Sequence, residues 1–477
     1  MDCGLFCARA FSPASGKHNS IRGFRRGHQT VHCPQSTVHS PLSPAHSPLK
    51  YNMNRYIIHG PSRISGSITL GGNKNAALPM IAAAMLTEEP LILHNVPDIL
   101  DVRNMLRVAS GLGAEVDFNA GTLRIQAKGQ IKTEISDNLC RLTRTSFLFA
   151  GPLCAHYGHS TIGSPGGDII GRRRLDTHVY GLGKLGMEIS RQGQGFVFSC
   201  KRLAGCEMFL DEASVTATEH IMLAAAYAEG TTMIRNAACE PHVTQLAKLL
   251  VAMGAEIDGI DTNILVIRGT RQLHGAEMTI ESDHVEAVSY LSLCAAAGGK
   301  IEIKGQISPH NYWMARRVLE KFGCSFTIRP NIITMKAPEQ MVVKPDLNNA
   351  IPCISDGPWP QFPSDMMSCM ITLATQAQGT VLFFEKMFES RMYFVDKLIS
   401  MGANAIVCDP HRVVISGPSK LHGVEMTSPD IRAGMAMLIA ACCAEGDSIV
   451  NNIDMIRRGY EALGDKLKLL GVDFEEC

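Results

Sequence analysis

Residues 243–257 read VTQLAKLLVAMGAEI, and this stretch joins a helix to a strand through a single glycine. Apolar residues recur at steps of three and four positions from Val243 to Met253, which is the spacing of one face of an α-helix. Gly254 suits the left-handed position that often follows the last turn of a helix, and Glu256 begins the expected strand. The same phrase, a glycine between two apolar residues, closes six segments of the chain at Gly113, Gly186, Gly254, Gly323, Gly402 and Gly471.

These glycines lie 73, 68, 69, 79 and 69 residues apart, so the chain repeats itself at a nearly constant interval. The same parts precede most of them in the same order. An Ala/Met-rich helix, such as Ile431 to Cys443, is followed by a turn, a β-rich strand such as Thr231 to Ile234, and a second amphipathic helix. The pattern predicts an α/β protein of six β-α-β-α-β units, and an even count divides into two domains of three units each.

Composition excludes several classes of protein. Of the 477 residues, 45% are hydrophobic and 19% are charged, so the chain can bury a large core and is not disordered as a whole. Lys plus Arg (45) equals Asp plus Glu (45), which argues against nucleic acid as a partner, because a surface that follows phosphates needs a basic excess. The longest apolar run, Ala76 to Leu86, contains Pro79 and is too short to span a membrane. We expect no nucleic-acid partner and no membrane partner.

The sixteen cysteines include no Cys-x-x-Cys pair. Most stand in apolar stretches, where a cysteine acts as a small buried hydrophobe, and a chain of this size has little need of disulfides. Their pattern predicts a reducing compartment.

Residues 1–52 differ from the rest of the chain. They hold six Lys or Arg, one acid, seven Ser and five Pro, without hydrophobic periodicity. Two interpretations stay open: an organelle transit peptide, which would place the protein in a plastid, or upstream sequence included by a start set before Met53. Under either one, we expect a disordered extension without a role in the chemistry.

Residues 70–77, which read LGGNKNAA, join an expected strand to a helix. The glycines let the backbone approach a ligand, and Lys74 at a helix N-terminus combines a positive charge with free N–H groups, which favours an anion. The stretch is not a P-loop, because GxxxxGK[ST] is absent, and an ordinary turn is the alternative.

Residues 163–178 read GSPGGDIIGRRRLDTH and predict a mobile loop. The loop carries Asp168 ahead of three consecutive arginines centred on Arg173. Arginine suits two-point contacts with phosphate or carboxylate, although a solvated charged loop would have the same composition.

Residues 357–366 read GPWPQFPSDM, where three prolines favour an extended approach to a helix near Met366. We expect Ser364 and Asp365 to cap that helix, a role that is more often structural than catalytic. Single arginines recur in the last two repeats at Arg391, Arg432, Arg457 and Arg458. Each alone would be an ordinary surface residue. Together with Lys74 they indicate a cleft between domains that closes on a small, highly charged anion.

In sequence the chain resembles the UDP-N-acetylglucosamine enolpyruvyl transferases, or 1-carboxyvinyltransferases. The resemblance runs from about Met53 to the C-terminus. It rests on five stretches in order: GNKNAALP from Gly72, RLTRTS from Arg141, PGGD from Pro165, FPSD from Phe362 and IRRGY from Ile456. The sister family that makes 5-enolpyruvylshikimate 3-phosphate is less similar, because residues 74–77 read KNAA where KSIS is expected.

The resemblance implies a two-domain inside-out α/β barrel, with three units per domain around buried parallel helices. The first domain would span residues 74–281, and the second would combine residues 53–73 with 282–477. The implied reaction transfers enolpyruvyl from phosphoenolpyruvate to the 3-hydroxyl of UDP-N-acetylglucosamine and releases phosphate, the first committed step of peptidoglycan synthesis. These two small molecules are the expected partners of a cytoplasmic monomer. No metal or organic cofactor is implied, because arginines replace the counter-ions.

The resemblance also implies residue roles. Asp365 matches the base that takes the hydroxyl proton, Asp168 stands at the position of the loop acid, and Lys74 and Arg458 complete the catalytic set. Phosphoenolpyruvate would be bound by Lys74, Asn75, Arg173, Arg391, Arg432 and Arg458. UDP-N-acetylglucosamine would be bound by Asn75, Arg144, Arg173, Arg174, Leu175, Asp176, Thr177, Ser214, Val215, Asp365 and Met387.

Three positions depart from the family pattern. Asp168 stands where many members carry cysteine, so a carboxyl with a pKa raised by burial would have to protonate C3. Resistance to the epoxide fosfomycin is therefore expected. Arg174 replaces a proline beside the uracil, and Glu212 replaces a lysine near the nucleotide. Two other functions stay open: transfer to another hydroxyl acceptor, such as a nucleoside monophosphate, and non-catalytic binding of a nucleotide sugar.

Overall fold

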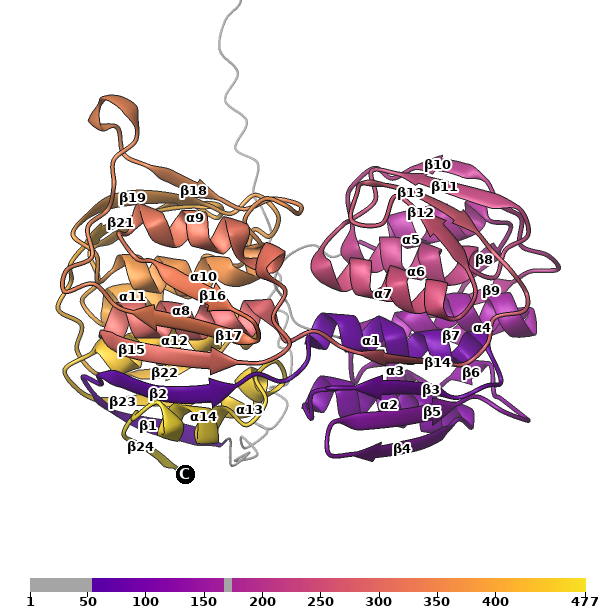
Figure 1. The fold of residues 1–477 in the computed structure, drawn as a ribbon, viewed down its shortest axis with the longest axis horizontal. Coiled ribbons are helices and arrows are strands. Elements are labelled where there is room, and N and C mark those ends of the chain that lie inside the picture. The colour runs from indigo at the N-terminus through magenta and orange to yellow at the C-terminus, as the bar shows by residue number, and fades with distance from the viewer. Residues whose placement is uncertain (1–53, 167–173) are drawn as a thin grey trace, which may run out of the picture. The chain divides into compact units, whose positions relative to one another are not determined.

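The computed structural model describes residues 54–166 and 174–477. The expectations for residues 1–52, Asp168 and Arg173 fall outside these described residues. Buried hydrophobic side chains form two separate clusters, one from residues 76–280 and one from residues 56–70 together with 285–472. We call the two parts lobe 1 and lobe 2; in Figure 1, lobe 1 carries the labels α1–α7 and lobe 2 the labels α8–α14.

The described residues of lobe 1 form three four-stranded sheets. In spatial order their strands are β14 (Ala276–Thr279), β3 (Leu91–His94), β5 (Thr122–Gln126) and β4 (Glu115–Asn119); β6 (Glu134–Ile135), β7 (His159–Ile162), β9 (Gly195–Ser199) and β8 (Glu188–Gln192); and β10 (Glu207–Phe209), β11 (Thr231–Arg235), β13 (Ile264–Arg268) and β12 (Glu256–Asp258).

In lobe 2 the described residues form three sheets of the same kind, and two of them take a strand from residues 55–69. Their strands are β2 (Ile64–Thr69), β15 (Gly299–Lys304), β17 (Ile332–Lys336) and β16 (Phe326–Arg329); β18 (Cys353–Ser355), β19 (Gly379–Phe384), β21 (Arg412–Gly417) and β20 (Ala405–Asp409); and β22 (Glu425–Thr427), β23 (Gly446–Asn451), β1 (Arg55–Gly60) and β24 (Phe474–Glu476).

All six sheets have one pattern of pairing. The first two strands are parallel, and the two other neighbouring pairs are antiparallel. Six repeated units are therefore confirmed. Each sheet has one strand more than the β-α-β-α-β pattern predicted, because an antiparallel strand of five or six residues (β5, β9, β13, β17, β21 or β1) lies between the predicted strands. All six glycines that close the repeats have positive φ, from 75° at Gly323 to 108° at Gly254, as the predicted helix caps require.

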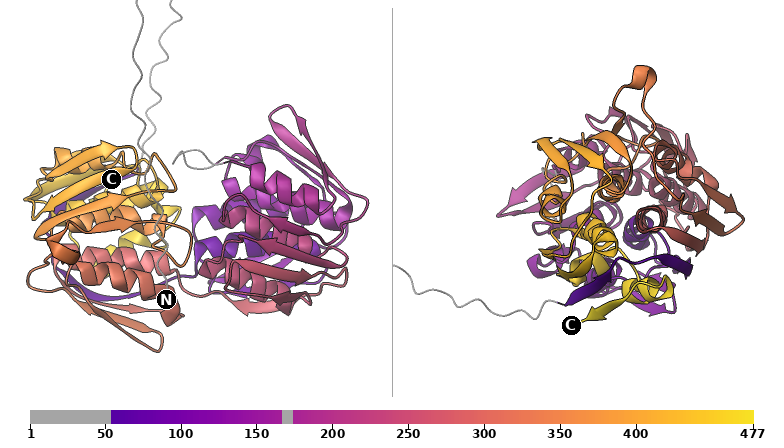
Figure 2. Two further views of the ribbon diagram at one scale, coloured as in Figure 1. Left: turned by 90° about the horizontal axis from the view of Figure 1, so that it is seen from above. Right: turned by 90° about the vertical axis from the view of Figure 1, so that its left-hand side faces the viewer.

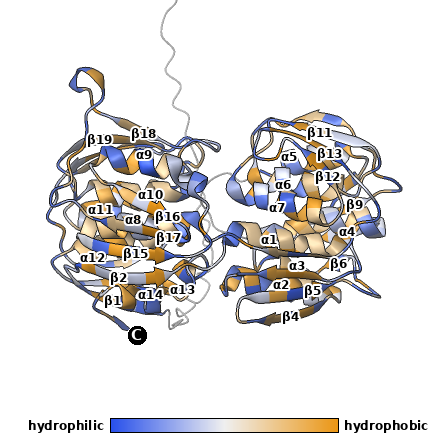
Figure 3. Cartoon of the chain, in the orientation of Figure 1, coloured by the Kyte–Doolittle hydropathy of each residue, from blue (hydrophilic) through white to orange (hydrophobic). Residues whose placement is uncertain are grey.

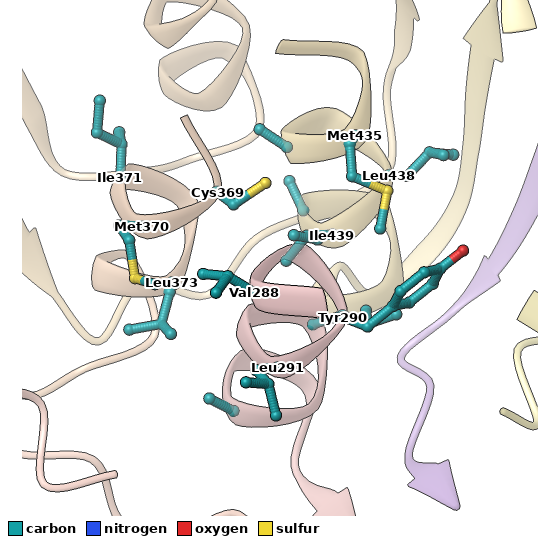
Figure 4. Close-up of a cluster of buried hydrophobic side chains, with 14 of the residues drawn as sticks. Val288, Tyr290, Leu291, Cys369, Met370, Ile371, Leu373, Met435, Leu438 and Ile439 are labelled. Carbon is teal, nitrogen blue, oxygen red and sulfur yellow. The ribbon is translucent and has the colours of Figure 1, made fainter. Parts of the chain in front are cut away.

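The first helix of each unit is buried on nearly every side. In lobe 2, Figure 4 shows side chains of three such helices meeting, among them Val288, Met370 and Ile439, and Figure 2 views these helices end-on with strands around them. Helices that are apolar all round belong to a core, which agrees with the hydropathy in Figure 3. They are α1 (Lys74–Ala83), α4 (Ala150–Tyr157), α6 (Val215–Ala225), α8 (His284–Ala297), α10 (Ser364–Ala374) and α12 (Ile431–Cys443).

The second helix of each unit leads into the repeat-closing glycine. These helices are α2 (Leu100–Leu112), α5 (Asp176–Lys184), α7 (Pro241–Ala252), α9 (Trp313–Lys321), α11 (Val395–Ser400) and α14 (Leu463–Leu469). Shorter segments are α3 (Asp137–Cys140), α13 (Ile453–Arg457), η1 (Ala84–Leu86), η2 (Arg144–Phe149), η3 (Pro309–Tyr312) and η4 (Leu347–Asn349). Among the described residues, no helix has both the length and the hydropathy to cross a membrane.

The chain passes between the lobes twice, and the two crossing segments pair with each other. Asn73 N–H donates to the Glu281 carbonyl at 2.8 Å, and Asp283 N–H donates to the Gly71 carbonyl at 3.1 Å. Asn73 and Asp283 then cap α1 and α8 with their side chains. The crossing therefore fixes where both helices begin, including the position of Lys74.

The sequence suggested that the glycines before Lys74 lie open to a ligand, but other protein atoms occupy the space beside them. A Cβ on Gly71 would meet the Glu461 carboxylate at 2.2 Å, and one on Gly72 would meet the Asn95 carbonyl at 1.8 Å. Gly72 is needed because the Asn95 backbone approaches closely there, whereas at Gly71 the close atom is the movable end of the Glu461 side chain.

Candidate active site

A cavity of about 140 Å³ gathers charged side chains from both lobes. Its basic residues come from α1, η2, the segment between β19 and α11, the first turn of α12, and the residue that follows α13. They are Lys74, Arg144, Arg391, Arg432 and Arg458, and the acids beside them are Asp101, Asp365 and Asp430. Five cations around so small a volume favour a small, highly charged anion.

Asp101, on α2, contacts one cation from each lobe, Lys74 of lobe 1 and Arg458 of lobe 2. Its carboxylate accepts hydrogen bonds from Lys74 Nζ at 3.2 Å and from Arg458 Nε at 2.9 Å, and the side chain is buried. Burial alone would raise the pKa of Asp101, but Lys74 and Arg458 outweigh burial and hold that pKa below its ordinary value. The carboxylate thus stays ionised and fixes the two cations.

Asp365 lies in the first turn of α10, between two buried arginines. Its Oδ1 accepts a hydrogen bond from Arg391 Nη2 at 2.5 Å, and its Oδ2 accepts from Arg432 Nε at 3.1 Å. Burial would raise the pKa of Asp365, but Arg391 and Arg432 hold it far below its ordinary value. The predicted capping role is wrong: α10 begins at Ser364 without a side-chain cap, because Asp365 binds the arginines instead.

The two arginines keep unused donors. Arg391 Nε and Arg432 Nη1 are buried and have no hydrogen-bond partner among the described residues. A buried unpaired donor is unfavourable, and an oxyanion is the group that a guanidinium binds best. Both arginines are therefore suited to a ligand with phosphate or carboxylate oxygens.

A second cavity, of about 470 Å³, lies beside the first. The N-terminus of α6 lines it at Ser214 and Val215, and the Ser214 side chain does not cap that helix. Free N–H groups at a helix N-terminus favour phosphate. Arg174, Glu212 and Met387 also line this cavity, so two of the positions that depart from the family pattern face it.

One end of the large cavity contains polar atoms without partners. Both ring nitrogens of His242 and Oε2 of Glu240 are buried and have no partner among the described residues. Burial lowers the pKa of His242 to about 3, so this ring is neutral near pH 7, and burial raises the pKa of Glu240 above its ordinary value. A ligand with several hydroxyl or amide groups would satisfy such atoms.

Four residues line both cavities: Arg144, Thr216, Asp365 and Arg391. Arg144 and Thr216 belong to lobe 1, while Asp365 and Arg391 belong to lobe 2. A ligand in the small cavity can therefore meet a ligand in the large one beside the Asp365 carboxylate. We call this place the junction.

Two buried carboxyl groups, those of Glu385 and Asp356, hold the segments that bring Asp365 and Arg391 to the junction. Glu385 Oε2 accepts a hydrogen bond from Ser364 Oγ at 2.7 Å, and its Oε1 accepts from the N–H groups of Met387 and Phe388 at 3.2 and 3.0 Å. Asp356 Oδ1 accepts from Lys386 N–H at 2.5 Å. Burial and the neighbouring Asp356 raise the pKa of Glu385 to about 8. This pair fixes the start of α10 and the loop that leads to Arg391.

Most of the residues singled out in the sequence come together. The small cavity is lined by Lys74, Asn75, Arg144, Asp365, Arg391, Arg432 and Arg458, and the large one by Arg144, Arg174, Ser214, Val215, Asp365, Met387 and Arg391. Leu175, Asp176 and Thr177 line neither cavity; Asp176 begins α5, and Thr177 donates to Glu212 at 3.4 Å. Asp168 and Arg173 lie outside the described residues.

Sequence reasoning missed Asp101, Glu385, His242 and Thr216. No local motif marks them. Asp101, Glu385 and Thr216 contact side chains more than 20 residues away, and His242 is notable only because the fold buries its ring nitrogens without a partner among the described residues. Only a buried acid within an amphipathic helix, as at Asp101, could have been noticed.

Residues 58–467 match the model of the family described as EPSP synthase (3-phosphoshikimate 1-carboxyvinyltransferase). The chain is 50% identical over 427 residues to the UDP-N-acetylglucosamine 1-carboxyvinyltransferase of Treponema denticola, covering 89% of this chain and 99% of that one. It is 48% identical over 424 residues to the enzyme of the same name from Borreliella burgdorferi, with the same coverage. The chain belongs to the UDP-N-acetylglucosamine 1-carboxyvinyltransferase family. Members of this family are transferases.

Solved structures agree with the fold of a 1-carboxyvinyltransferase. The enolpyruvyl transferase NikO from Streptomyces tendae superimposes with a TM-score of 0.79 at 22% identity, over 89% of this chain and 99% of that one. The EPSP synthase of Acinetobacter baumannii gives a TM-score of 0.70 at 17% identity, over 89% and 100%. The fold is thus the inside-out α/β barrel of the enolpyruvyl transferases, as the resemblance implied.

Proposed function

We propose that the protein transfers the enolpyruvyl group of phosphoenolpyruvate to the 3-hydroxyl of UDP-N-acetylglucosamine and releases phosphate. The observation that carries this proposal is the junction: a small cationic cavity meets a larger cavity beside the Asp365 carboxylate. The names of relatives at 48% and 50% identity support the choice of substrates. The reaction would be the first committed step of peptidoglycan synthesis, with roles in cell shape and division.

The small cavity suits phosphoenolpyruvate. Lys74 and Arg458, held by Asp101, would bind its phosphate together with Arg173, while Arg391 and Arg432 offer unused donors for its oxygens. Asn75 lines the same cavity. The arginines supply the positive charge that a metal ion would otherwise bring, so we propose no cofactor.

The large cavity suits the sugar nucleotide. The N-terminus of α6 at Ser214 and Val215 would bind the diphosphate, and Arg144, Arg174 and Met387 would line the rest of the ligand. Leu175, Asp176 and Thr177 line neither cavity, so their contact with the nucleotide stays a prediction from the sequence.

The chemistry needs one base and one acid. Asp365 at the junction would take the proton of the 3-hydroxyl as the oxygen attacks C2, and Asp168 would protonate C3. Loss of phosphate from C2 and of a proton from C3 then gives the enolpyruvyl ether. Because Arg391 and Arg432 hold the pKa of Asp365 far below its ordinary value, an anion that takes over these arginines would make Asp365 a stronger base.

The decisive assay measures phosphate release from phosphoenolpyruvate by protein that begins at Met53, with and without UDP-N-acetylglucosamine. Release that depends on the sugar nucleotide and is lost in Asp365→Ala supports the proposal. Release only with another hydroxyl acceptor, such as a nucleoside monophosphate, would replace the acceptor. No release with any acceptor, combined with binding of UDP-N-acetylglucosamine, would leave a non-catalytic binder.

Fosfomycin tests the identity of the loop acid. A carboxylate is a weaker nucleophile toward an epoxide than a thiolate, so we expect the protein to resist inactivation and Asp168→Cys to become sensitive. Time-dependent loss of activity with the drug measures both variants. Rapid inactivation of the unaltered protein would contradict the assignment.

We also propose that the two lobes are domains with the boundaries 74–281 and 53–73 plus 282–477, and that the protein is a cytoplasmic monomer. The two separate hydrophobic clusters support the domain boundaries. Sedimentation equilibrium would test the oligomeric state.

A further inference from the structure

The junction contains a threonine whose hydroxyl contacts a buried histidine, and that histidine contacts a second one. Thr216, the second residue of α6, lines both cavities, and its Oγ1 lies 3.2 Å from Nε2 of His178 on α5. His178 Nδ1 lies 3.1 Å from Nδ1 of His220, which is also on α6. His220 Nε2 in turn lies 2.7 Å from the backbone nitrogen of Gly151. These contacts form one chain from the start of α4 to the junction.

The proton positions in this series of hydrogen bonds follow from one fixed donor. The Gly151 N–H can only donate, so Nε2 of His220 must be unprotonated and accept. A neutral His220 then carries its proton on Nδ1 and donates it to Nδ1 of His178. His178 must therefore carry its own proton on Nε2, and it donates that proton to Thr216 Oγ1.

The opposite proton arrangement fails at the contact between His220 and Gly151. If Thr216 donated to His178, the His178 Nδ1–H would need an accepting Nδ1 on His220. The His220 proton would then sit on Nε2 and face the Gly151 N–H at 2.7 Å, so two donors would point at each other. Since Gly151 lies in the first turn of α4, where N–H groups have no partner within the helix, His220 also satisfies an otherwise unpaired donor.

The surroundings keep both histidines neutral. His178 is 3% exposed and His220 is fully buried, and the Phe147 ring packs edge-on against both at 5.3 and 5.4 Å. Burial lowers the pKa of His220 to about 3, and burial, His220 and Arg144 hold the pKa of His178 well below its ordinary value. The proton arrangement should therefore not change near neutral pH.

Because Thr216 Oγ1 already accepts from His178, its own proton is free to point elsewhere. The side chain is partly exposed, and no other hydrogen bond of Oγ1 occurs within the described residues. We propose that Thr216 is a further substrate-binding residue, which donates its hydroxyl proton to an oxyanion at the junction, with His178 and His220 as positioning residues. The oxyanion is a phosphate or carboxylate oxygen of either substrate. This proposal rests on the proposed function for the identity of those substrates.

The proton arrangement can be read without catalysis. In protein with ¹⁵N-labelled histidine, NMR should show His178 protonated on Nε2 and His220 on Nδ1, both unchanged from about pH 5 to pH 9. A proton on Nδ1 of His178, or titration of either ring in this range, would overturn the proposal. This readout stands even if the protein proves to release no phosphate.

Binding tests the hydroxyl itself. Thr216→Val keeps the shape and removes the donor, while Thr216→Ser keeps the donor. Loss of a hydrogen bond to a charged group predicts about 10- to 100-fold weaker binding of one ligand in T216V, and T216S should recover most of that affinity. Calorimetry with inorganic phosphate and with UDP-N-acetylglucosamine identifies which substrate provides the oxyanion. The KM values for the two substrates provide the same comparison during turnover.

Two controls separate binding from structure. Thr231→Val, on an exposed position of β11, makes the same change away from both cavities and should leave both affinities unaltered. His220→Gln should weaken binding in the normal background but have no further effect in T216V, since His220 acts only through Thr216. Additive effects of the two changes, or equal affinities of T216V and T216S, would contradict the proposal.

Discussion

Replacing Asp365 with asparagine should weaken turnover and strengthen anion binding at the same time. Asp365 engages Arg391 at 2.5 Å and Arg432 at 3.1 Å, and a substrate anion in the small cavity needs the same guanidinium groups. The carboxylate therefore competes with the substrate. A neutral amide of the same shape would release the arginines without opening a cavity.

The size of the effect follows from these contacts. A hydrogen bond to a charged group contributes about 1.5 to 3 kcal/mol, and the 30% exposure of the Asp365 side chain points to the lower end of that range. We expect about tenfold tighter binding of inorganic phosphate, which corresponds to about 1.4 kcal/mol. Loss of the proposed base should lower turnover by about 10²- to 10⁴-fold.

Calorimetric titration with inorganic phosphate and the phosphate-release assay measure the two effects on the same preparation. Asp409→Asn is the matched control, since it removes one negative charge from an exposed ion pair with Arg412. It should change neither quantity. If D365N binds phosphate no better than the unaltered protein, the carboxylate does not compete with the anion and the reasoning is wrong.

Two further predictions concern stability. The pKa of Glu385 is raised to about 8 from 4.5, so the folded state keeps a proton that the unfolded chain releases. The free energy of unfolding should thus fall as pH rises between about 4.5 and 8, and Glu385→Gln should reduce this fall. Urea unfolding at pH 6 and pH 8.5 measures the fall in both proteins, and an equal fall in the two would contradict the prediction. Gly151→Ala would place a Cβ 2.6 Å from the His220 ring and should destabilise the protein by about 1 to 3 kcal/mol, whereas Gly183→Ala, with open space in α5, should not destabilise it. A melting curve of G151A that matches that of G183A would argue against the close contact.

Periodicity and caps predicted much of the fold. The helix expected over Ile431 to Cys443 is α12 with the same bounds, and the six closing glycines all adopt positive φ. In five sheets the second strand of the hairpin after the glycine was missed, because so short a hairpin gives little periodic signal; in the sixth sheet β1 takes that place. That β1 and β2 belong to lobe 2 depends on pairing with strands more than 200 residues away, which no local pattern records.

The site was predictable to a smaller extent. Charge and loop composition identified Lys74, Arg391 and Arg432 as candidates, but not that Asp365 would sit between two arginines instead of capping its helix. The roles of Glu385 and Thr216 come from contacts with side chains and amides that the fold brings together. Such contacts have no counterpart in local sequence.

The pairing of β1 has a consequence for synthesis on the ribosome. Ile57 pairs with Ile449 and with Glu475, so the first strand of the described chain must wait for almost the last residues to emerge. At about 5 to 20 residues per second this delay is about 20 to 80 seconds. Lobe 1, whose strands all lie between residues 91 and 279, can complete its sheets during that time. Translation therefore favours an order of assembly in which lobe 1 completes its sheets first and β1 pairs with β23 and β24 last.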